Sequence, residues 1–267
     1  MNTYKTSDIA RIIGIHVNTV RLYETCGLIP KPERKENGYR VFNDLHLEQF
    51  RLARAALQVE VLQNGLRKRA VQIVMVSAAG DYDRAARLTQ EYLAQVDMEI
   101  AHAEEAIEIT REILSGFSKG SGPAKVSGYD KACSEIVYTR KEAAESLHVT
   151  IDTLRNWELN GLFTIKRREN GYRVYTEEDM QRLKIIRSLR CANYSLSAIL
   201  RMLRGLTSDP DVDIRQVINT PDESDDIITA CDKLLTSLNE AKKNACYVAG
   251  QIEKMKKMKP TFNHQTS

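Results

Sequence analysis

The chain has 267 residues, of which 42% are hydrophobic and 28% charged, with only 13 Gly and 6 Pro. This length predicts about two domains, and the low Gly and Pro content excludes a collagen-like or low-complexity chain. The net charge of +3 is too small to identify a nucleic-acid-binding protein, but its excess lies in residues 1–57 (+3) and 135–190 (+2). Two separate basic segments are what two DNA-facing modules require.

The cysteine pattern and the apolar runs exclude several classes of protein. No two of the five cysteines have a CxxC spacing, so neither a disulfide framework nor a zinc knuckle is predicted. The N-terminus lacks the apolar core of a signal peptide, and no run of about 20 apolar residues exists. There is no Walker loop, GxSxG or other catalytic spacing. We therefore expect a cytoplasmic, nucleoid-associated protein with no catalytic residues and no membrane partner.

The N-terminal segment predicts a helix, a turn, a second helix and a hairpin. Thr6 can cap the first helix. Residues 17–26 form the second, and Gly27 follows it where a left-handed C-cap residue belongs. Asn37 and Gly38, between strand-like residues, predict a two-residue type I′ turn with positive φ at both positions. A longer amphipathic helix follows, which completes a winged helix-turn-helix.

Residues 81–115 contain neither Pro nor Gly and predict one long helix. Apolar residues and two threonines recur in steps of three and four, which is typical of a coiled coil. The following Gly-, Ser- and Lys-rich stretch, residues 116–134, is expected to be a flexible linker. The predicted seam consists of Ala86, Thr89, Leu93, Val96, Ile100, Ala103, Ile107, Thr110 and Leu114.

The second half of the chain repeats the first. Residues 138–163 match residues 4–29 at a constant offset of 134, and the string ENGYRV occurs in both copies. Agreement over about 45 residues indicates an internal duplication, so Thr139 is the second expected cap. A second long helix is predicted over residues 221–258, with Thr220 as its cap and Pro221 as its first residue. Its seam is expected at Ile228, Cys231, Leu235, Leu238, Ala245, Val248, Ile252 and Met255.

The expected fold is mostly α, with duplicated winged helix-turn-helix modules that are each followed by a long coiled-coil helix. The two long helices are expected to pair as an intramolecular antiparallel coiled coil, which would make the chain a pseudo-dimer. The expected parts are module 1 (1–78), long helix 1 (79–115), the linker (116–134), module 2 (135–212), long helix 2 (213–259) and a tail (260–267).

Each copy resembles the MerR family of bacterial transcription regulators. In the first copy the resemblance lies in residues 19–24 (TVRLYE), 27–30 (GLIP) and 37–42 (NGYRVF). In the second copy it lies in residues 153–158 (TLRNWE), 161–162 (GL) and 170–175 (NGYRVY). The resemblance covers about 70 residues of each half and continues more loosely into the long helices.

The resemblance implies a DNA-binding surface on each module. Arg and Asn suit guanine and adenine edges, whereas hydroxyls and Lys suit phosphates. Some of these side chains have alternative roles: the helix arginines can pair with Glu24 and Glu158, and the aromatic residues can belong to the core or pack the hairpins. The expected DNA-binding residues are Thr6, Asn18, Thr19, Arg21, Tyr23, Lys35, Tyr39 and Arg40 in the first copy, and Thr139, Asp152, Thr153, Arg155, Trp157, Arg167, Arg168, Tyr172 and Arg173 in the second.

MerR-like proteins are typically homodimers joined by such helices, whereas this chain carries both helices itself. We favour a single-chain pseudo-dimer; the alternative is a homodimer with four modules. The copies differ at recognition positions, since Asn18 becomes Asp152 and Leu22 becomes Asn156. A homodimer reads identical half-sites, so this divergence predicts an asymmetric operator.

The resemblance further implies binding to double-stranded promoter DNA and distortion of the promoter spacer to control RNA polymerase. An architectural or excision-type DNA-binding accessory protein of a mobile element is the alternative. Metal-sensing relatives place cysteines beyond the long helix, where this chain has none, so no metal site or cofactor is expected. The identity of a small-molecule effector stays open; its candidate contacts are Tyr82, Tyr92 and Tyr247.

Overall fold

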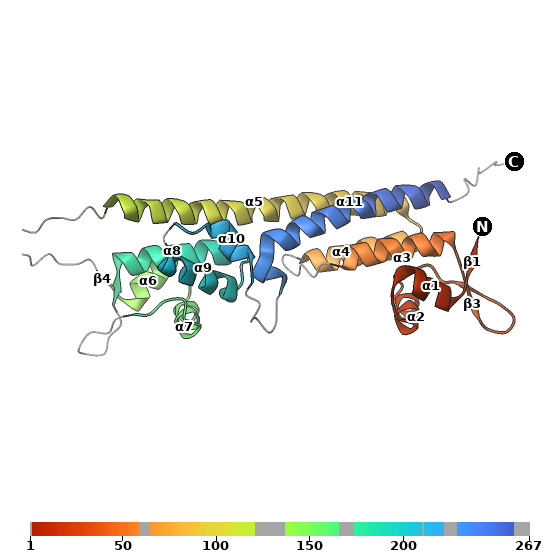
Figure 1. The fold of residues 1–267 in the computed structure, drawn as a ribbon, viewed down its shortest axis with the longest axis horizontal. Helices are drawn as coiled ribbons and strands as arrows, with labels where there is room; N and C mark the ends of the chain where they lie inside the picture. Colours follow the sequence, from red (N-terminus) through yellow and green to blue (C-terminus); the bar gives the residue numbers. More distant parts are fainter. Residues whose placement is uncertain are drawn as a thin grey trace, which may run out of the picture. The chain divides into compact units, whose positions relative to one another are not determined.

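The computed structural model describes residues 2–58, 65–120, 137–165, 174–209, 211–221 and 229–258, with side chains up to residue 115 in the second range. It divides into two compact units, one formed by residues 1–98 with 237–267 and the other by residues 99–236. The long helices α5 (Tyr82–Gly120) and α11 (Leu234–Met258) contribute to both units. The described residues are mainly helical (Figure 1), as predicted.

The first module has the predicted helix, helix, hairpin, helix order. Its small antiparallel sheet has the strand order β1-β3-β2, with Tyr4 opposite Phe42 and Glu33 opposite Val41. The elements are β1 (Thr3–Tyr4), α1 (Thr6–Ile13), α2 (Val17–Thr25), β2 (Glu33–Arg34), β3 (Arg40–Asn43), α3 (Asp44–Leu57) and α4 (Leu66–Ala78).

The described residues of the second module repeat the helix pair, one strand pairing and the helices that follow. Strands β4 and β5 pair antiparallel, with Tyr138 opposite Tyr175. Gly161 has φ of +75°, as Gly27 has +68° after α2, so both glycines adopt the predicted left-handed conformation after the second helix. The elements are β4 (Val137–Tyr138), α6 (Arg140–Ser146), α7 (Ile151–Leu159), β5 (Tyr175–Thr176), α8 (Glu177–Cys191) and α9 (Leu196–Ser208).

A polar side chain from the helix after the strands binds a backbone carbonyl in each module; Gln49 is buried, whereas Arg182 is exposed. In the first, the Gln49 amide donates to the backbone carbonyls of Leu28 and Val74, each at 3.0 Å. In the second, Arg182 donates to the carbonyl of Leu162 at 3.2 Å. Because Leu162 is the counterpart of Leu28, the same carbonyl is satisfied in both modules by different donors, as buried backbone groups require.

The predicted caps are correct in one copy only. Thr139 caps α6, where its Oγ1 accepts from the N–H of Glu142 at 3.3 Å. In the first copy the prediction was wrong, because Thr6 is the first helical residue and Lys5 is the N-cap. The helix begins one residue early since the Asp8 carboxylate accepts the Lys5 N–H at 2.9 Å.

The hairpin of the first module differs from the predicted type I′ turn. Gly38 has φ of +79°, but Asn37 is not in the left-handed region. The Gly38 N–H donates to Lys35 O at 2.8 Å, and the Lys35 N–H donates to Tyr39 O at 2.9 Å. This is a three-residue loop that ends in a glycine bulge, which needs only one residue with positive φ. The predicted turn at Asn170 and Gly171 lies outside the described residues.

The second long helix begins later than predicted. Residues 214–219 form a separate helix α10 (Ile214–Asn219), Thr220 is its C-cap, and a 3₁₀ turn, η2 (Ala230–Lys233), precedes α11. Polar side chains hold this segment: Arg201 donates to the carbonyls of Val217, Ile218 and Asp232. Arg201 thus satisfies carbonyls in the last turn of α10 and in η2, where the helical hydrogen-bond pattern ends. Cys231 is half-buried in η2, and Ile228 lies outside the described residues.

The buried stripe of α5 is shifted from the prediction along one of its two rows. Thr89, Val96, Ala103 and Thr110 are buried, as predicted, but the second row contains Tyr92 and not Leu93. This row consists of alanine, tyrosine and glutamate residues. Hydrophobicity alone therefore favoured the adjacent positions, such as Leu93, which are less buried. The helix continues to Gly120, so residues 116–120 are not linker, and the rest of the predicted linker lies outside the described residues. The buried residues of the stripe are Tyr82, Ala85, Thr89, Tyr92, Val96, Glu99, Ala103, Ala106, Ile107 and Thr110.

His46 makes the stability of the first module depend on pH. Its ring packs against Phe42, its Nδ1 accepts the Asn43 N–H at 3.2 Å, and burial lowers its pKa from 6.5. The unfolded chain therefore takes up a proton first as the pH falls. This contribution to stability is complete above the unfolded-state pKa of about 6.5 and is lost as the pH falls from there towards the lower pKa of the folded state.

We expect the melting temperature to fall between pH 7.5 and pH 5.5 by less in a His46→Gln variant than in the wild type, because the glutamine does not titrate. Thermal unfolding at the two pH values measures this. His148 is exposed at the turn of the second module, so His148→Gln is the matched control and should keep the wild-type pH dependence. Equal pH dependence in the wild type and the His46 variant would contradict the prediction.

Candidate DNA interface

The packing of α2 determines which of its side chains face solvent. Val20 is buried, and Tyr23 is only 8% exposed because its ring stacks on Phe50 at a centroid distance of 5.7 Å. Tyr23 therefore belongs to the core and not to the expected DNA surface. Asn18 and Arg21 are exposed on the opposite side of the helix, and the expected contacts Thr19 and Thr6 are half-buried.

The carboxylate of Glu24 connects α2 to the hairpin. It accepts from Arg40, and from Arg34 at 3.4 Å. The anticipated alternative, a pair between Arg21 and Glu24, is absent among the described residues, so Arg21 stays exposed. Arg40, an expected DNA contact, is instead engaged in fixing the wing against the recognition helix.

The tip of the first hairpin presents polar side chains to solvent. Tyr39 is 72% exposed, so it does not pack the hairpin, and Lys35 is also exposed. These two side chains lie beyond α2 in a loop whose backbone is fixed by the hydrogen bonds described above. Both side chains are exposed to solvent, and their contact with DNA stays a prediction.

The second module exposes the same helix face with different chemistry. Trp157 is 4% exposed and so is a core residue, like its counterpart Tyr23. Asp152, Arg155 and Asn156 are exposed, Thr153 is half-buried, and Thr139 is exposed but serves as a cap. Glu158 pairs with Arg140 of α6 at 3.2 Å. The expected wing residues Arg167, Arg168, Tyr172 and Arg173 lie outside the described residues.

Two arginines that the sequence analysis missed lie beside α7. A groove of about 560 Å³ runs between the first turns of α7 and the end of α8, and Arg187 and Arg190 line it together with Thr150, Asp152 and Asn156. The arginines are three residues apart on the helix that follows the wing, which places them near one face. That spacing was the signal that could have identified them.

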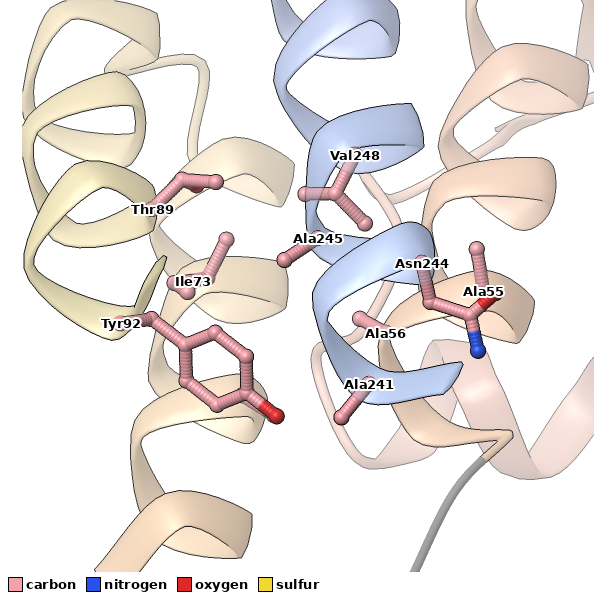
Figure 2. Close-up of a pocket in the computed structure, with 10 residues that line it drawn as sticks. Ala55, Ala56, Ile73, Thr89, Tyr92, Ala241, Asn244, Ala245 and Val248 are labelled. Carbon is pink, nitrogen blue, oxygen red and sulfur yellow. The ribbon is translucent and has the colours of Figure 1, made fainter. Parts of the chain in front are cut away.

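The candidate tyrosines for an effector do not form one site. Tyr92 lines a small cavity between α3, α4, α5 and α11 in the first unit (Figure 2), whereas Tyr82 is buried elsewhere and Tyr247 is exposed and bonded to Gln251. The cavity measures about 20 Å³ and has several alanines in its wall. This volume accommodates about one water molecule, so it is too small for an organic effector. Among the described residues, no group of three or more His, Cys, Asp or Glu is placed to hold a metal ion.

The different burial of neighbouring residues on α2 predicts unequal effects on stability. Tyr23→Ala should lower the free energy of unfolding by about 3 kcal/mol, because it removes a buried aromatic ring. Leu22 is 56% exposed, so Leu22→Ala should change it by less than about 0.5 kcal/mol. Chemical denaturation followed by circular dichroism measures both values. Similar losses for the two variants would show that α2 buries a different face.

Comparison with known proteins finds a MerR-type family model that matches each module. Residues 5–42 match the model of the MerR family regulatory protein, and residues 138–206 match the MerR HTH family regulatory protein. No helix in the described part of the chain has the length and apolar character needed to cross a membrane. No solved structure is significantly similar to the chain.

Individual relatives match over about a quarter of the chain. The HTH-type transcriptional regulator CueR of Escherichia coli is 45% identical over 53 residues, which are 20% of this chain and 39% of the relative. ZntR of Escherichia coli is 41% identical over 76 residues, or 28% of this chain and 53% of the relative. Nodulation protein NolA of Bradyrhizobium elkanii is 40% identical over 68 residues, or 25% and 31%. The chain thus spans about half or less of these relatives, and each of its two helix-turn-helix modules matches a MerR-family model.

Proposed function

We propose that the chain is a sequence-specific transcription regulator that binds an asymmetric operator in double-stranded promoter DNA. It controls RNA polymerase there by distorting the promoter spacer. One observation carries the asymmetry: α2 and α7 bury the same face through Tyr23 and Trp157 but expose different side chains. The relatives CueR and ZntR, which are described as transcriptional regulators, support the class of function.

The exposed residues of each recognition helix suit base edges in a major groove. Arg21 and Arg155 suit guanine, Asn18 suits adenine, and Asp152 accepts a hydrogen bond from cytosine but repels phosphate. The two modules therefore favour unlike half-sites. Two separate contacts on one duplex also supply the binding energy that a distortion of the DNA costs.

Phosphate contacts come from side chains around each helix. Lys35 and Tyr39 at the first hairpin, and Arg187 and Arg190 beside α7, are suited to this role. Cationic contacts of this kind release counterions, so binding should weaken steeply with salt. They position the modules, whereas the recognition helices select the sequence.

The single chain acts as its own dimer in this proposal. The first unit already combines α5 of the first half with α11 of the second half, and Lys242 pairs with Asp97 at 2.7 Å. The resemblance to MerR-like proteins implies that in a homodimer two such helices come from separate chains. Because its two halves are covalently joined and differ in sequence, the chain needs no second copy. Its operator is therefore not required to be a palindrome.

Selection of binding sites from random DNA by the full chain tests the asymmetry. The wild type should select two unlike half-sites. Asp152→Asn combined with Asn156→Leu gives α7 the surface of α2, so it should make the selected site more symmetric and weaken binding to the wild-type operator by about 5- to 150-fold. The reciprocal variant, Asn18→Asp with Leu22→Asn, is the matched control and should change the other half-site.

A selected palindrome whose halves are bound equally by either module would overturn the asymmetry. Transcription in vitro on promoters of different spacer length tests the action on RNA polymerase. The effect of the protein on transcription should vanish when the spacer is shortened. Tight, DNA-bending binding without any effect on transcription would identify the architectural or excision-type alternative instead.

A further inference from the structure

A buried carboxylate on the first module makes an ion pair with the far end of the chain. Glu48 of α3 is 5% exposed, and its Oε1 accepts from Arg51 at 2.7 Å and from Lys254 of α11 at 2.9 Å. Arg51 belongs to the same helix, so Lys254 is the partner from outside the module. A buried carboxylate is costly without cationic partners, so this position requires a basic residue from the helix that covers it.

Two further ion pairs join the same helices. Lys242 pairs with Asp97 at 2.7 Å, and Lys256 pairs with Asp83, so the lysines of α11 meet the aspartates of α5 in antiparallel order. The hydrogen bond from Lys256 holds the pKa of Asp83 below its usual value. All these residues lie in the first unit. Charged pairs that flank a helical seam determine the partner and orientation of the helices.

The charge of α11 differs from that of the helix segment that would replace it in a symmetric dimer. Residues 237–258 hold five lysines and two glutamates, a net charge of +3. An antiparallel pair of two α5 helices would instead oppose residues 82–98 with residues 99–115, which hold five glutamates and one arginine, a net charge of −4. The acidic groups of the first module would then face further acidic groups, which disfavours this pairing.

The second module lacks the buried carboxylate. Asn43 and Thr176 cap α3 and α8 at equivalent positions, so Glu48 corresponds to Gln181. Gln181 donates to Glu177 of its own helix at 2.9 Å. Among the described residues at this position, the carboxylate that accepts from a basic helix is therefore present in the first module and absent from the second, which gives α11 a preference between them.

We infer that the three pairs Lys254–Glu48, Lys242–Asp97 and Lys256–Asp83 make α11 the specific partner of the first module and exclude pairing between the α5 helices of two copies. The inference rests on the single-chain arrangement proposed above. The charges select the helix, whereas the buried apolar stripe supplies most of the attraction, since exposed ion pairs contribute little by themselves.

Charge reversal in the full chain tests this inference. Lys242→Asp with Lys256→Asp should lower the melting temperature by about 5 °C, because two attractions become repulsions. Adding Asp97→Lys and Asp83→Lys should restore most of the loss. Lys243 and Lys257 form no ion pair with the described residues, so Lys243→Asp with Lys257→Asp is the matched control and should leave the melting temperature within about 1 °C.

A second readout comes from mixing two proteins, one that carries only the lysine reversals at 242 and 256 and one that carries only the aspartate reversals at 83 and 97. The lysine-reversed chain has aspartates on α11, and the aspartate-reversed chain has lysines on the half of α5 that pairs with α11, so each carries the charges that the other lacks. Sedimentation should show a complex of twice the 30.3 kDa chain mass in the mixture, and not in either protein alone. Failure of the four-residue variant to recover stability, or a control that loses as much as the lysine reversal, would overturn the inference.

The two proposals fail in different ways. If the wild type sediments as a dimer but the four-residue variant recovers stability, the ion pairs do select α11 and the single-chain arrangement is wrong. If the wild type is a monomer and the four-residue variant does not recover its melting temperature, the single-chain arrangement stands and the selection by ion pairs is wrong.

Discussion

The structure depends on the burial of one aromatic side chain in each recognition helix. Tyr23 stacks on Phe50, and Trp157 occupies the corresponding place in the second module. A helix that buries one face has no freedom to rotate, so the opposite face is fixed. The exposed residues Asn18 and Arg21, and Asp152 and Arg155, are consequences of this single contact, and so is any sequence preference they produce.

An acidic residue near the end of each of these helices binds arginine from a neighbouring element, which is the wing in the first module and α6 in the second. Glu24 binds Arg34 and Arg40 of the first hairpin, and Glu158 binds Arg140. The two copies therefore keep the carboxylate and change its partner, as they keep the carbonyl of Leu28 or Leu162 and change its donor. The duplicated modules thus share the same polar acceptors but differ in the side chains that donate to them.

The sequence predicted the order of elements, the two glycine caps and much of the buried stripes, because these follow from local chemistry and periodicity. It did not predict the burial of Tyr92 in place of Leu93, since either row satisfies the same helical spacing. The break before α11 was also missed, because Arg201 satisfies carbonyls that are distant in sequence. For Tyr23 and Trp157 the sequence left core and DNA roles open, and only packing against α3 or α8 separates them.

The pair between Glu48 and Lys254 has a consequence for the synthesis of the protein. The first unit includes residues 237–258, so the ribosome must make nearly the whole chain before that unit can be completed. During this interval the buried stripe of α5 and the Glu48 carboxylate lack their cover. The module that is translated first is therefore finished last, and a chain truncated before α11 leaves it exposed to aggregation and proteolysis.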